Sequence, residues 1–352
     1  MKSLLPLLSI LFFSCIEKVD EFEVDSRSDN LVIFGTLNDT PGPHRLEVGR
    51  VVRLASSLDN RPVPGITTVQ LVDEAGNAWD YVDRGAGVYV LPAGSVTPQQ
   101  GVEYHLRLVD QPLGIDIESQ PERMPQRVNI DTVRTEVIRT TVRNELGNVR
   151  ERFVLEATAE ADLPNEPVNL RWEVIEVWNF MEIAVPGCPN CPPPATCYFT
   201  ESPELDGRTY NGFVFNNDRI EKTVARRELN NRAYQSRHYF NIYQHSISSN
   251  ALRYFEELDL IRNQGGLFDV PPGALQGNLV NKSDSDDELV LGYFQVGPTD
   301  TLRAFVTRND LDPFPLQTVC IIGFSDDPSD YPRECFRCEE IPDASFERPW
   351  WF

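Results

Sequence analysis

The sequence predicts a mainly β protein, in which an N-terminal Ig-like or transthyretin-like β-sandwich is followed by a larger β-rich domain with one main helix. Two observations predict this class. Runs of β-forming residues recur about every 8–12 residues with turn signals between them, which is the spacing of a β-sandwich. Proline is abundant, at 27 of 352 residues, and prolines that fix loops between short strands fit an extracellular β protein. A chain of this length can hold two domains, each with its own core.

Residues 1–14 have the form of a bacterial signal peptide. Lys2 supplies the positive charge, and Leu4 to Phe13 is an apolar run that is too short to span a bilayer. A small residue, Ser14, precedes Cys15 directly after this run, as at a lipoprotein signal peptidase site. We therefore expect cleavage before Cys15 and lipidation of that cysteine, which would anchor the chain in the outer membrane. The alternative is an ordinary secretory signal followed by a chance cysteine.

Residues 15–30 are polar and acidic, and we interpret them as a lipidated tether. The carboxylates lie soon after the anchor, at Glu17, Asp20, Glu21 and Glu23. Such residues resemble the surface-export signals of Bacteroidota lipoproteins. This resemblance predicts a protein that faces the cell exterior, whereas a simple solvated spacer would also allow the periplasmic face.

The formal net charge of −22 limits the class of partner. Nucleic-acid phosphates demand clustered Lys and Arg, so we expect no nucleic-acid partner. After the signal peptide, no apolar run approaches the roughly 18 residues that a membrane-spanning helix needs.

The N-terminal sandwich is expected over residues 31–122. Its first strand is Leu31 to Leu37, which ends at a turn over 38–43. Further strands are expected within 44–54, 69–73, 85–90 and 104–109, with a turn over 74–77. The stretch from Pro62 to Val90 resembles the pattern of small Ig-like or transthyretin-like modules.

The second domain is expected over residues 123–352, after a hinge at 121–125. Strands are expected at 153–157, 170–178, 289–294, 302–306 and 319–324. In the strand over 170–178 both faces mix polar and apolar residues, so this strand is expected to have protein on both sides. One helix is expected over 249–264, capped by Ser248 or Ser249 and stopped by Gly265-Gly266. Its apolar stripe of Leu252, Phe255, Leu258 and Ile261 is expected to pack in the core.

Six cysteines remain after Cys15, an even number that predicts three disulfides in an exported protein. They are Cys188, Cys191, Cys197, Cys320, Cys335 and Cys338. At least one long-range bridge is favoured, because it would contribute about 4–5 kcal/mol in the chain-entropy model. The alternative is a zinc site formed by the two C-x-x-C pairs, with Cys197 bonded to Cys320. A redox role for either C-x-x-C pair is a weaker alternative, since the first lies in a proline-rich loop.

No other group of residues in the sequence indicates a catalytic or metal-binding site. His44, His105, His238 and His245 are expected in surface or half-buried positions, and the last two should lie on opposite faces of one strand. The acidic run 283–288 could offer oxygen ligands to calcium, but like Ser325-Asp326-Asp327 it fits a solvated acidic turn better. The chain carries no recognised catalytic or nucleotide-binding motif. We expect no enzymatic activity, no catalytic residue, no metal and no cofactor, although an unmarked carboxylate pair could still belong to a hydrolase.

The second half of the chain resembles a known family. The motifs that carry the resemblance are 266–272, 277–279, 290–294, 335–338 and 348–352, in that order after the helix. Together with the N-terminal β-module, they are similar to the domain of unknown function 4249 family of Bacteroidota outer-membrane lipoproteins.

This resemblance implies a non-enzymatic function. Genes of the family tend to lie beside genes for TonB-dependent outer-membrane receptors, which implies an accessory lipoprotein that helps such a receptor to capture or gate a nutrient. The alternative is a free-standing surface module that binds glycan or protein through exposed aromatic rings. Candidate rings are Trp178, Tyr198, Trp350 and Trp351, although core packing is the expected role of each.

Overall fold

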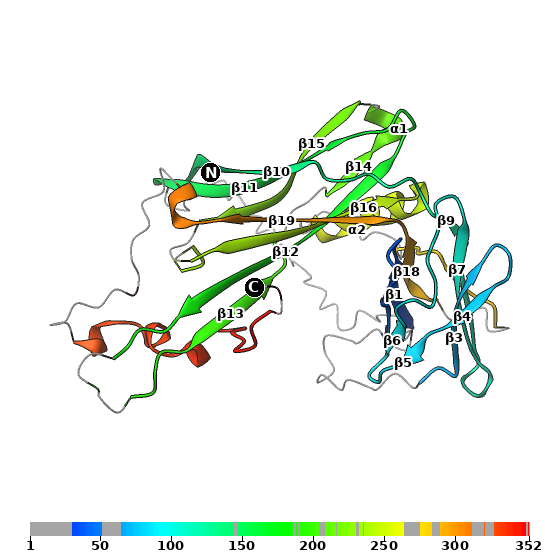
Figure 1. Cartoon of the computed structure of the whole chain (residues 1–352), viewed down its shortest axis with the longest axis horizontal. Coiled ribbons are helices and arrows are strands. Elements are labelled where there is room, and N and C mark those ends of the chain that lie inside the picture. The colour runs from blue at the N-terminus through cyan, green and yellow to red at the C-terminus, as the bar shows by residue number, and fades with distance from the viewer. Residues whose placement is uncertain are drawn as a thin grey trace, which may run out of the picture.

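The computed structural model describes residues 30–50, 65–143, 147–185, 188, 191–203, 208–215, 217–229, 232–234, 236–263, 275–283, 289–311, 320, 327–349 and 351. The expected signal peptide, Cys15 and residues 16–29 of the tether lie outside these residues. The described chain is mainly β, as the sequence predicts, and it is arranged as two packed pairs of sheets (Figure 1). Within it, no helix is long and apolar enough to cross a membrane.

The N-terminal module consists of two sheets. The first has the order β18-β1-β2-β6-β5, with β18 at Leu291–Val296, β1 at Leu31–Leu37, β2 at His44–Arg50, β6 at Val88–Leu91 and β5 at Val82–Asp83. The second has the order β17-β8-β7-β3-β4, with β17 at Leu279–Asn281, β8 at Ile115–Ser119, β7 at Glu103–Asp110, β3 at Thr68–Asp73 and β4 at Ala78–Asp80; β9 (Glu122–Arg123) also pairs with β7. Alternate residues of each strand face one shared core, as Tyr104, Leu106 and Leu108 do in β7.

Two strands of this module come from the far end of the chain. β18 pairs in parallel with β1, with Val32 opposite Leu291, and β17 pairs with β8. In Figure 1 the orange β18 accordingly lies beside the blue β1. The sequence-based boundaries of 31–122 and 123–352 omit this contribution, and the strand expected at 289–294 belongs to the N-terminal module. The pairing covers an edge of β1 that would otherwise present unpaired backbone groups.

The second domain also packs two sheets around one core. One sheet has the order β10-β11-β15, formed by Thr132–Arg143, Val149–Asp162 and Arg219–Glu228. The other has the order β13-β12-β16-β19, formed by Thr196–Glu201, Asn169–Met181, His238–Ile247 and Thr299–Val306, and β14 (Thr209–Asn211) pairs with β12. The short helix α1 (Gly212–Phe215) follows β14.

The central strand β12 has protein on both sides for part of its length, as its sequence predicts. Its even-numbered residues from Leu170 to Phe180 are all buried and face the other sheet. On its opposite face, Val177 is also buried. Glu176 is fully buried among the apolar residues of the inner face, so its charge needs partners there.

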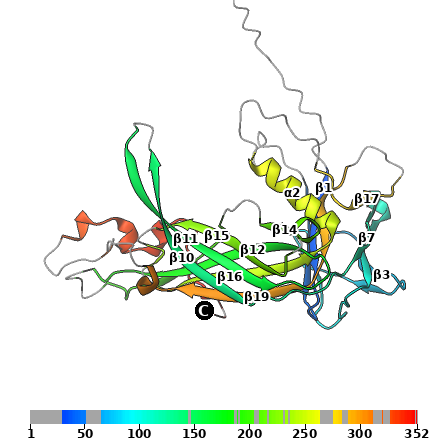
Figure 2. The same ribbon diagram turned by 90° about the horizontal axis from the view of Figure 1, so that it is seen from above.

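Helix α2 (Ser249–Asn263) joins the two modules and confirms the one main helix that the sequence predicts. The Ser248 hydroxyl accepts a hydrogen bond from the Ala251 amide, 3.0 Å away, and so caps the helix N-terminus. Leu252 and Tyr254 are buried against Tyr293 of β18, with Phe255 and Leu258 packed around them. Figure 2 shows α2 lying close to β1 and β14, where the two modules meet.

A buried carboxylate also lies at this junction. Glu122 accepts hydrogen bonds from the hydroxyl groups of Tyr293 and Ser248 and from the amide of Val296. Burial raises the pKa of Glu122 above its ordinary value, and these three donors oppose the rise. In the described parts of the chain, five further short helices are 3-10 turns, at Gln111–Leu113, Arg308–Leu311, Pro328–Asp330, Arg333–Cys335 and Cys338–Glu340.

Candidate functional site

The six predicted cysteines lie at the end of the second domain that is remote from the N-terminal module. They form three disulfides, Cys188–Cys191, Cys197–Cys338 and Cys320–Cys335. The second bridge spans 141 positions, in agreement with the expected long-range bridge. In Figure 1 the orange and red C-terminal turns that carry Cys335 and Cys338 accordingly lie at the opposite end from β3 and β4.

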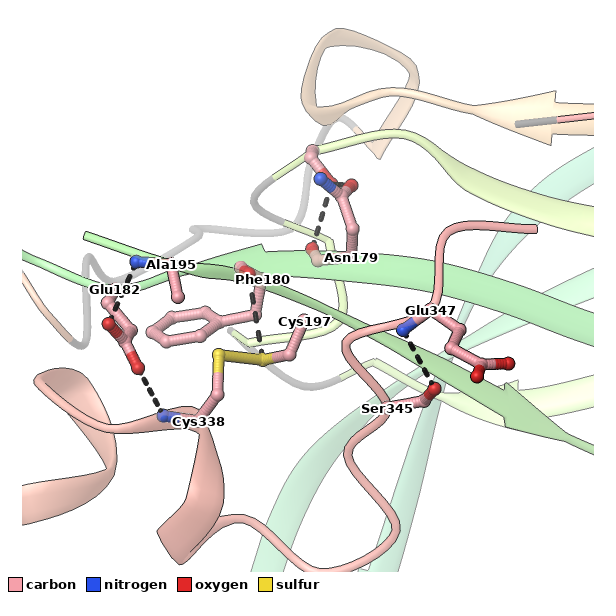
Figure 3. The surroundings of a disulfide bond; sticks show 9 residues. Asn179, Phe180, Glu182, Ala195, Cys197, Cys338, Ser345 and Glu347 are labelled. Atoms are coloured by element: carbon pink, nitrogen blue, oxygen red, sulfur yellow. Dashed lines mark hydrogen bonds between the residues drawn. A yellow bond between two sulfur atoms is a disulfide. The ribbon is translucent and has the colours of Figure 1, made fainter. Parts of the chain in front are cut away.

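The Cys197–Cys338 disulfide fastens the C-terminal segment to strand β13 (Figure 3). Beside it, the two carboxylate oxygens of Glu182 accept hydrogen bonds from the amides of Cys338 and Ala195, at 2.7 and 2.8 Å. The Cys335 carbonyl accepts a third hydrogen bond, from the Ile183 amide, at 2.9 Å. The segment is therefore held by both covalent and backbone contacts, although its residues are largely polar.

The zinc alternative requires four free thiols in the two C-x-x-C pairs, and all four are bonded in disulfides. Cys188 is bonded to Cys191, whereas Cys335 and Cys338 are bonded to partners outside their own pair. Across the described parts of the chain, no group of three or more His, Cys, Asp or Glu side chains is placed to hold a metal ion.

Beyond the disulfides, the C-terminal tail runs onto the outer face of the sheet β13-β12-β16-β19. Ser345 forms an antiparallel bridge with Tyr198 of β13, with two backbone hydrogen bonds of 2.8 and 2.9 Å. Further along the tail, Trp351 contacts Tyr239 of β16. The tail thus carries an aromatic side chain across to strands that are distant in the sequence.

Three aromatic rings and two arginines gather on this outer face. The ring centroids of Tyr239 and Phe305 are 5.6 Å apart, and those of Tyr239 and Trp351 are 5.5 Å apart. The Arg237 guanidinium lies 5.2 Å from the Phe305 ring centroid, and the Arg303 guanidinium lies 3.7 Å from that of Trp351. We call these five residues the aromatic–arginine face.

Strand register explains why these residues meet. Tyr239 lies opposite Phe305, and Asn241 lies opposite Arg303, in the antiparallel pair β16–β19. In β16, His238, Phe240 and Ile242 face the core, so the odd-numbered residues point to the outer face. Phe305 remains 49% exposed there, and Arg237 and Arg303 are exposed as well.

Of the four aromatic candidates from the sequence, only Trp351 belongs to this face. Trp178 is buried and stacks on Phe199 with a centroid distance of 3.9 Å, which confirms its expected core role. Tyr198 is half-buried and pairs with Ser345 of the tail, and Trp350 lies outside the described residues. Tyr239 and Phe305 were not nominated. Both residues alternate with core residues along their strands, 238–247 and 299–306. This alternation could have identified them as outward-facing rings.

The histidine expectation is wrong for three of the four residues, because His44, His238 and His245 are buried. Only His105 is half-buried, 3.3 Å from Glu118. For His238 and His245 the reason lies in the polar partners that the sheets supply. His238 and His245 do lie on opposite faces of β16, as expected, opposite Trp178 and Arg171 of β12.

On the inner face, His238 belongs to a buried charged cluster. Its Nε2 lies 3.1 Å from the Glu176 carboxylate, which also binds Arg227 Nη1 at 2.6 Å. Arg227 extends the cluster to the more exposed Glu201, and the Tyr234 ring stacks on His238 at 4.6 Å. The buried Glu176 charge is therefore paired, which fits a structural ion-pair network.

On the other face, His245 Nδ1 lies 2.9 Å from the Thr299 hydroxyl. Burial, and secondarily the charge of Arg171, lowers the pKa of His245 to about 3. This histidine therefore stays uncharged at neutral pH. Its Nε2 lies 4.0 Å from the Glu173 carboxylate, but no group of three or more metal-ligating side chains is found among the described residues.

A hollow of about 480 Å³ lies against the cystine-rich turns. It is lined by Val185, Ser329, Arg333, Phe336, Arg337 and Glu340. A second, open hollow of about 540 Å³ lies on the outer side of β10, β11 and β15, where Arg152, Glu156, Arg226 and Glu228 line it with mixed charges. Of the acidic runs weighed for calcium, 284–288 and 325–326 lie outside the described residues.

One protein-family comparison places the chain among known sequences. The family described as "Domain of unknown function (DUF4249)" matches residues 19–303. A comparison with curated proteins finds no match. The matched region covers both modules but ends before Cys320 and the C-terminal tail.

Proposed function

Since the chain belongs to the DUF4249 family, we propose that it is a surface-exposed outer-membrane lipoprotein. It is held in the membrane through Cys15 and acts as a non-enzymatic accessory of a TonB-dependent receptor in nutrient capture or gating. The single observation that carries a binding role is the aromatic–arginine face, which presents rings and cations on a rigid sheet.

The disulfides support a location outside the cytoplasm. Bridges persist in oxidising compartments and are rare where thiols are kept reduced. All six cysteines after Cys15 are paired. This agrees with the export signal over residues 1–14 and with lipidation at Cys15.

The two buried acids described above both have structural partners. Glu176 is held by Arg227 and His238, and Glu122 is held by Tyr293 and Ser248. A glycosidase-type pair needs two carboxylates that flank an accessible substrate. These two buried acids instead serve the packing of the sandwich core and of the module junction.

Co-purification tests the receptor partnership. The affinity tag belongs in the turn at 74–77, because this turn is exposed and lies away from the aromatic–arginine face. Solubilised in mild detergent, the tagged protein is expected to bring down a large β-barrel protein, and the tag is expected to be accessible to antibody on intact cells. Recovery of the protein without a barrel, even after crosslinking, would contradict the partnership.

A second candidate function is that of a free-standing module that binds glycan or protein at the cell surface. The aromatic–arginine face favours it, since rings and arginines are the side chains that dominate recognition surfaces. This candidate requires ligand binding by the purified protein without any barrel.

A further inference from the structure

We propose that the aromatic–arginine face binds an acidic polysaccharide whose sugar rings carry carboxylates. The proposal rests on the binding role above and names the ligand class for that surface.

The three rings supply stacking surface for sugars. Phe305, Tyr239 and Trp351 are in contact through centroid distances of 5.6 and 5.5 Å, so they form one continuous aromatic path. Their planes are inclined by 47° and 77°, so the path is contoured rather than flat. A pyranose ring presents C–H groups on its faces, and these pack on aromatic faces while the hydroxyl groups stay in water.

The two arginines supply sites for anions. Arg303 is held in one orientation, because its Nε donates to Asn241 Oδ1 at 2.6 Å and its guanidinium lies on the Trp351 ring. A guanidinium fixed in this way still presents its terminal N–H groups, which match a carboxylate in a bidentate geometry. Arg237 lies over Phe305 at the other end of the ring path.

Charge complementarity points to an anionic ligand. The chain carries 54 acidic against 32 basic residues, yet within the described residues neither Arg237 nor Arg303 forms an ion pair with a carboxylate. The nearby acid on this face, Glu173, lies 3.7 Å from Arg171 instead. Because these two cations have no acid partner among the described residues of a strongly acidic protein, we infer that the ligand supplies the carboxylates.

This charge distribution also separates the possible occupants. A neutral glycan would stack on the rings but would form no ion pair with the arginines. The net charge of −22 repels any polyanion, and it opposes a nucleic acid most strongly, because duplex DNA carries one negative charge per ~1.7 Å of helix. A polyuronate combines stackable rings with one carboxylate on each sugar, so it uses both parts of the face.

Binding of polygalacturonate by the full-length, oxidised protein in detergent tests the proposal, with dextran as the neutral comparison. We expect polygalacturonate to bind, with an affinity that falls as salt rises, and dextran to bind at least tenfold more weakly. Arg303→Gln and Phe305→Ala are each expected to weaken polygalacturonate binding by about tenfold, since each removes a direct contact.

Matched controls are available on the same chain. Phe213→Ala removes a ring that is 64% exposed on α1, and Arg123→Gln removes an exposed arginine that is paired with Glu103. Both variants are expected to bind as the wild type does. The proposal is overturned if the wild type does not bind polygalacturonate, if dextran binds equally well, or if the face variants lose no more than the controls.

The same variants distinguish this proposal from the receptor partnership. If Phe305→Ala abolishes co-purification of a β-barrel while polygalacturonate never binds, the face is a protein interface and the glycan proposal is wrong. If polygalacturonate binding depends on the face and no barrel co-purifies, the glycan proposal stands and the receptor partnership fails.

Discussion

Cys197 and Cys338 are joined by a disulfide although they lie 141 positions apart in the sequence. The bond connects strand β13 to the C-terminal turns, and the tail that follows pairs with β13 through Ser345 and reaches Tyr239 through Trp351. This one crosslink therefore secures the segment that completes the aromatic–arginine face.

Loss of this bridge is expected to destabilise the protein strongly. In the chain-entropy model a loop of this length contributes about 5 kcal/mol, less any strain, whereas the short Cys188–Cys191 loop contributes about 1.5 kcal/mol. Urea denaturation should therefore show a much larger loss for the double variant Cys197→Ala/Cys338→Ala than for Cys188→Ala/Cys191→Ala. Equal losses would show that the long loop is already constrained without the bridge.

Gly292 is expected to be essential for the contribution of β18 to the N-terminal module. Its φ is +99°, and a Cβ there would lie 2.0 Å from the Ile33 carbonyl oxygen of β1. Gly292→Ala should cost roughly 3 kcal/mol or more, because it adds both backbone strain and a clash with backbone. Gly49→Ala is the control, since a Cβ at that position meets nothing within 4 Å. Similar thermal melts for both variants would contradict the parallel β1–β18 pairing.

The same pairing changes what an isolated N-terminal fragment should do. Residues 31–122 alone lack β17 and β18, so β1 would expose an unpaired edge. The sequence alone predicts that this segment is a sandwich domain with its own core. The structure instead leads us to regard 275–296 as part of the same folding unit.

Arg227 is expected to be required because it pairs with the fully buried Glu176. Arg227→Met should cost about 3–5 kcal/mol, since it leaves a buried carboxylate without its cation. Adding Glu176→Gln removes that charge and should restore much of the stability. A double-mutant cycle measured in urea checks this, and additive losses would contradict the coupling.

Burial of His245 predicts a pH dependence of stability. Its pKa is lowered from 6.5 to about 3 in the folded protein, so the unfolded chain binds a proton first as the pH falls below 6.5. The stability due to this group is complete above pH 6.5 and declines toward pH 3, by about 2 kcal/mol between pH 7 and pH 5. His245→Gln should lose about that much less stability than the wild type over the same interval. Parallel curves for the two proteins would show that His245 titrates normally.

Local sequence signals were sufficient for much of the fold. The strand at Leu31–Leu37 was predicted at its observed bounds, and the helix was predicted to within one residue, because β-forming runs, turn residues and a capping serine act over a few positions. The mixed pattern of 170–178 predicted protein on both sides of this strand, which the structure shows for part of its length. Disulfide formation followed from the even cysteine count and the export signal.

Long-range features were not predictable in this way. No local pattern identifies 291–296 as the partner of 31–37, because parallel pairing leaves no turn signal between the strands. The burial of His238 depends on Glu176, which lies 62 positions away. The aromatic–arginine face depends on the register of β16 and β19 and on the path of the tail. Neither can be predicted from the residue pattern of one strand.

The measurement that tests the central claim most directly is lipid attachment at Cys15, because the proposed location and partnership both depend on the anchor. Cells fed a palmitate analogue are expected to label the wild-type protein in the outer-membrane fraction, and Cys15→Ala is expected to be unlabelled, since it lacks the acceptor sulfur. Equal labelling of the two proteins, or no labelling of the wild type, would contradict the claim that this chain is a lipoprotein anchored through Cys15.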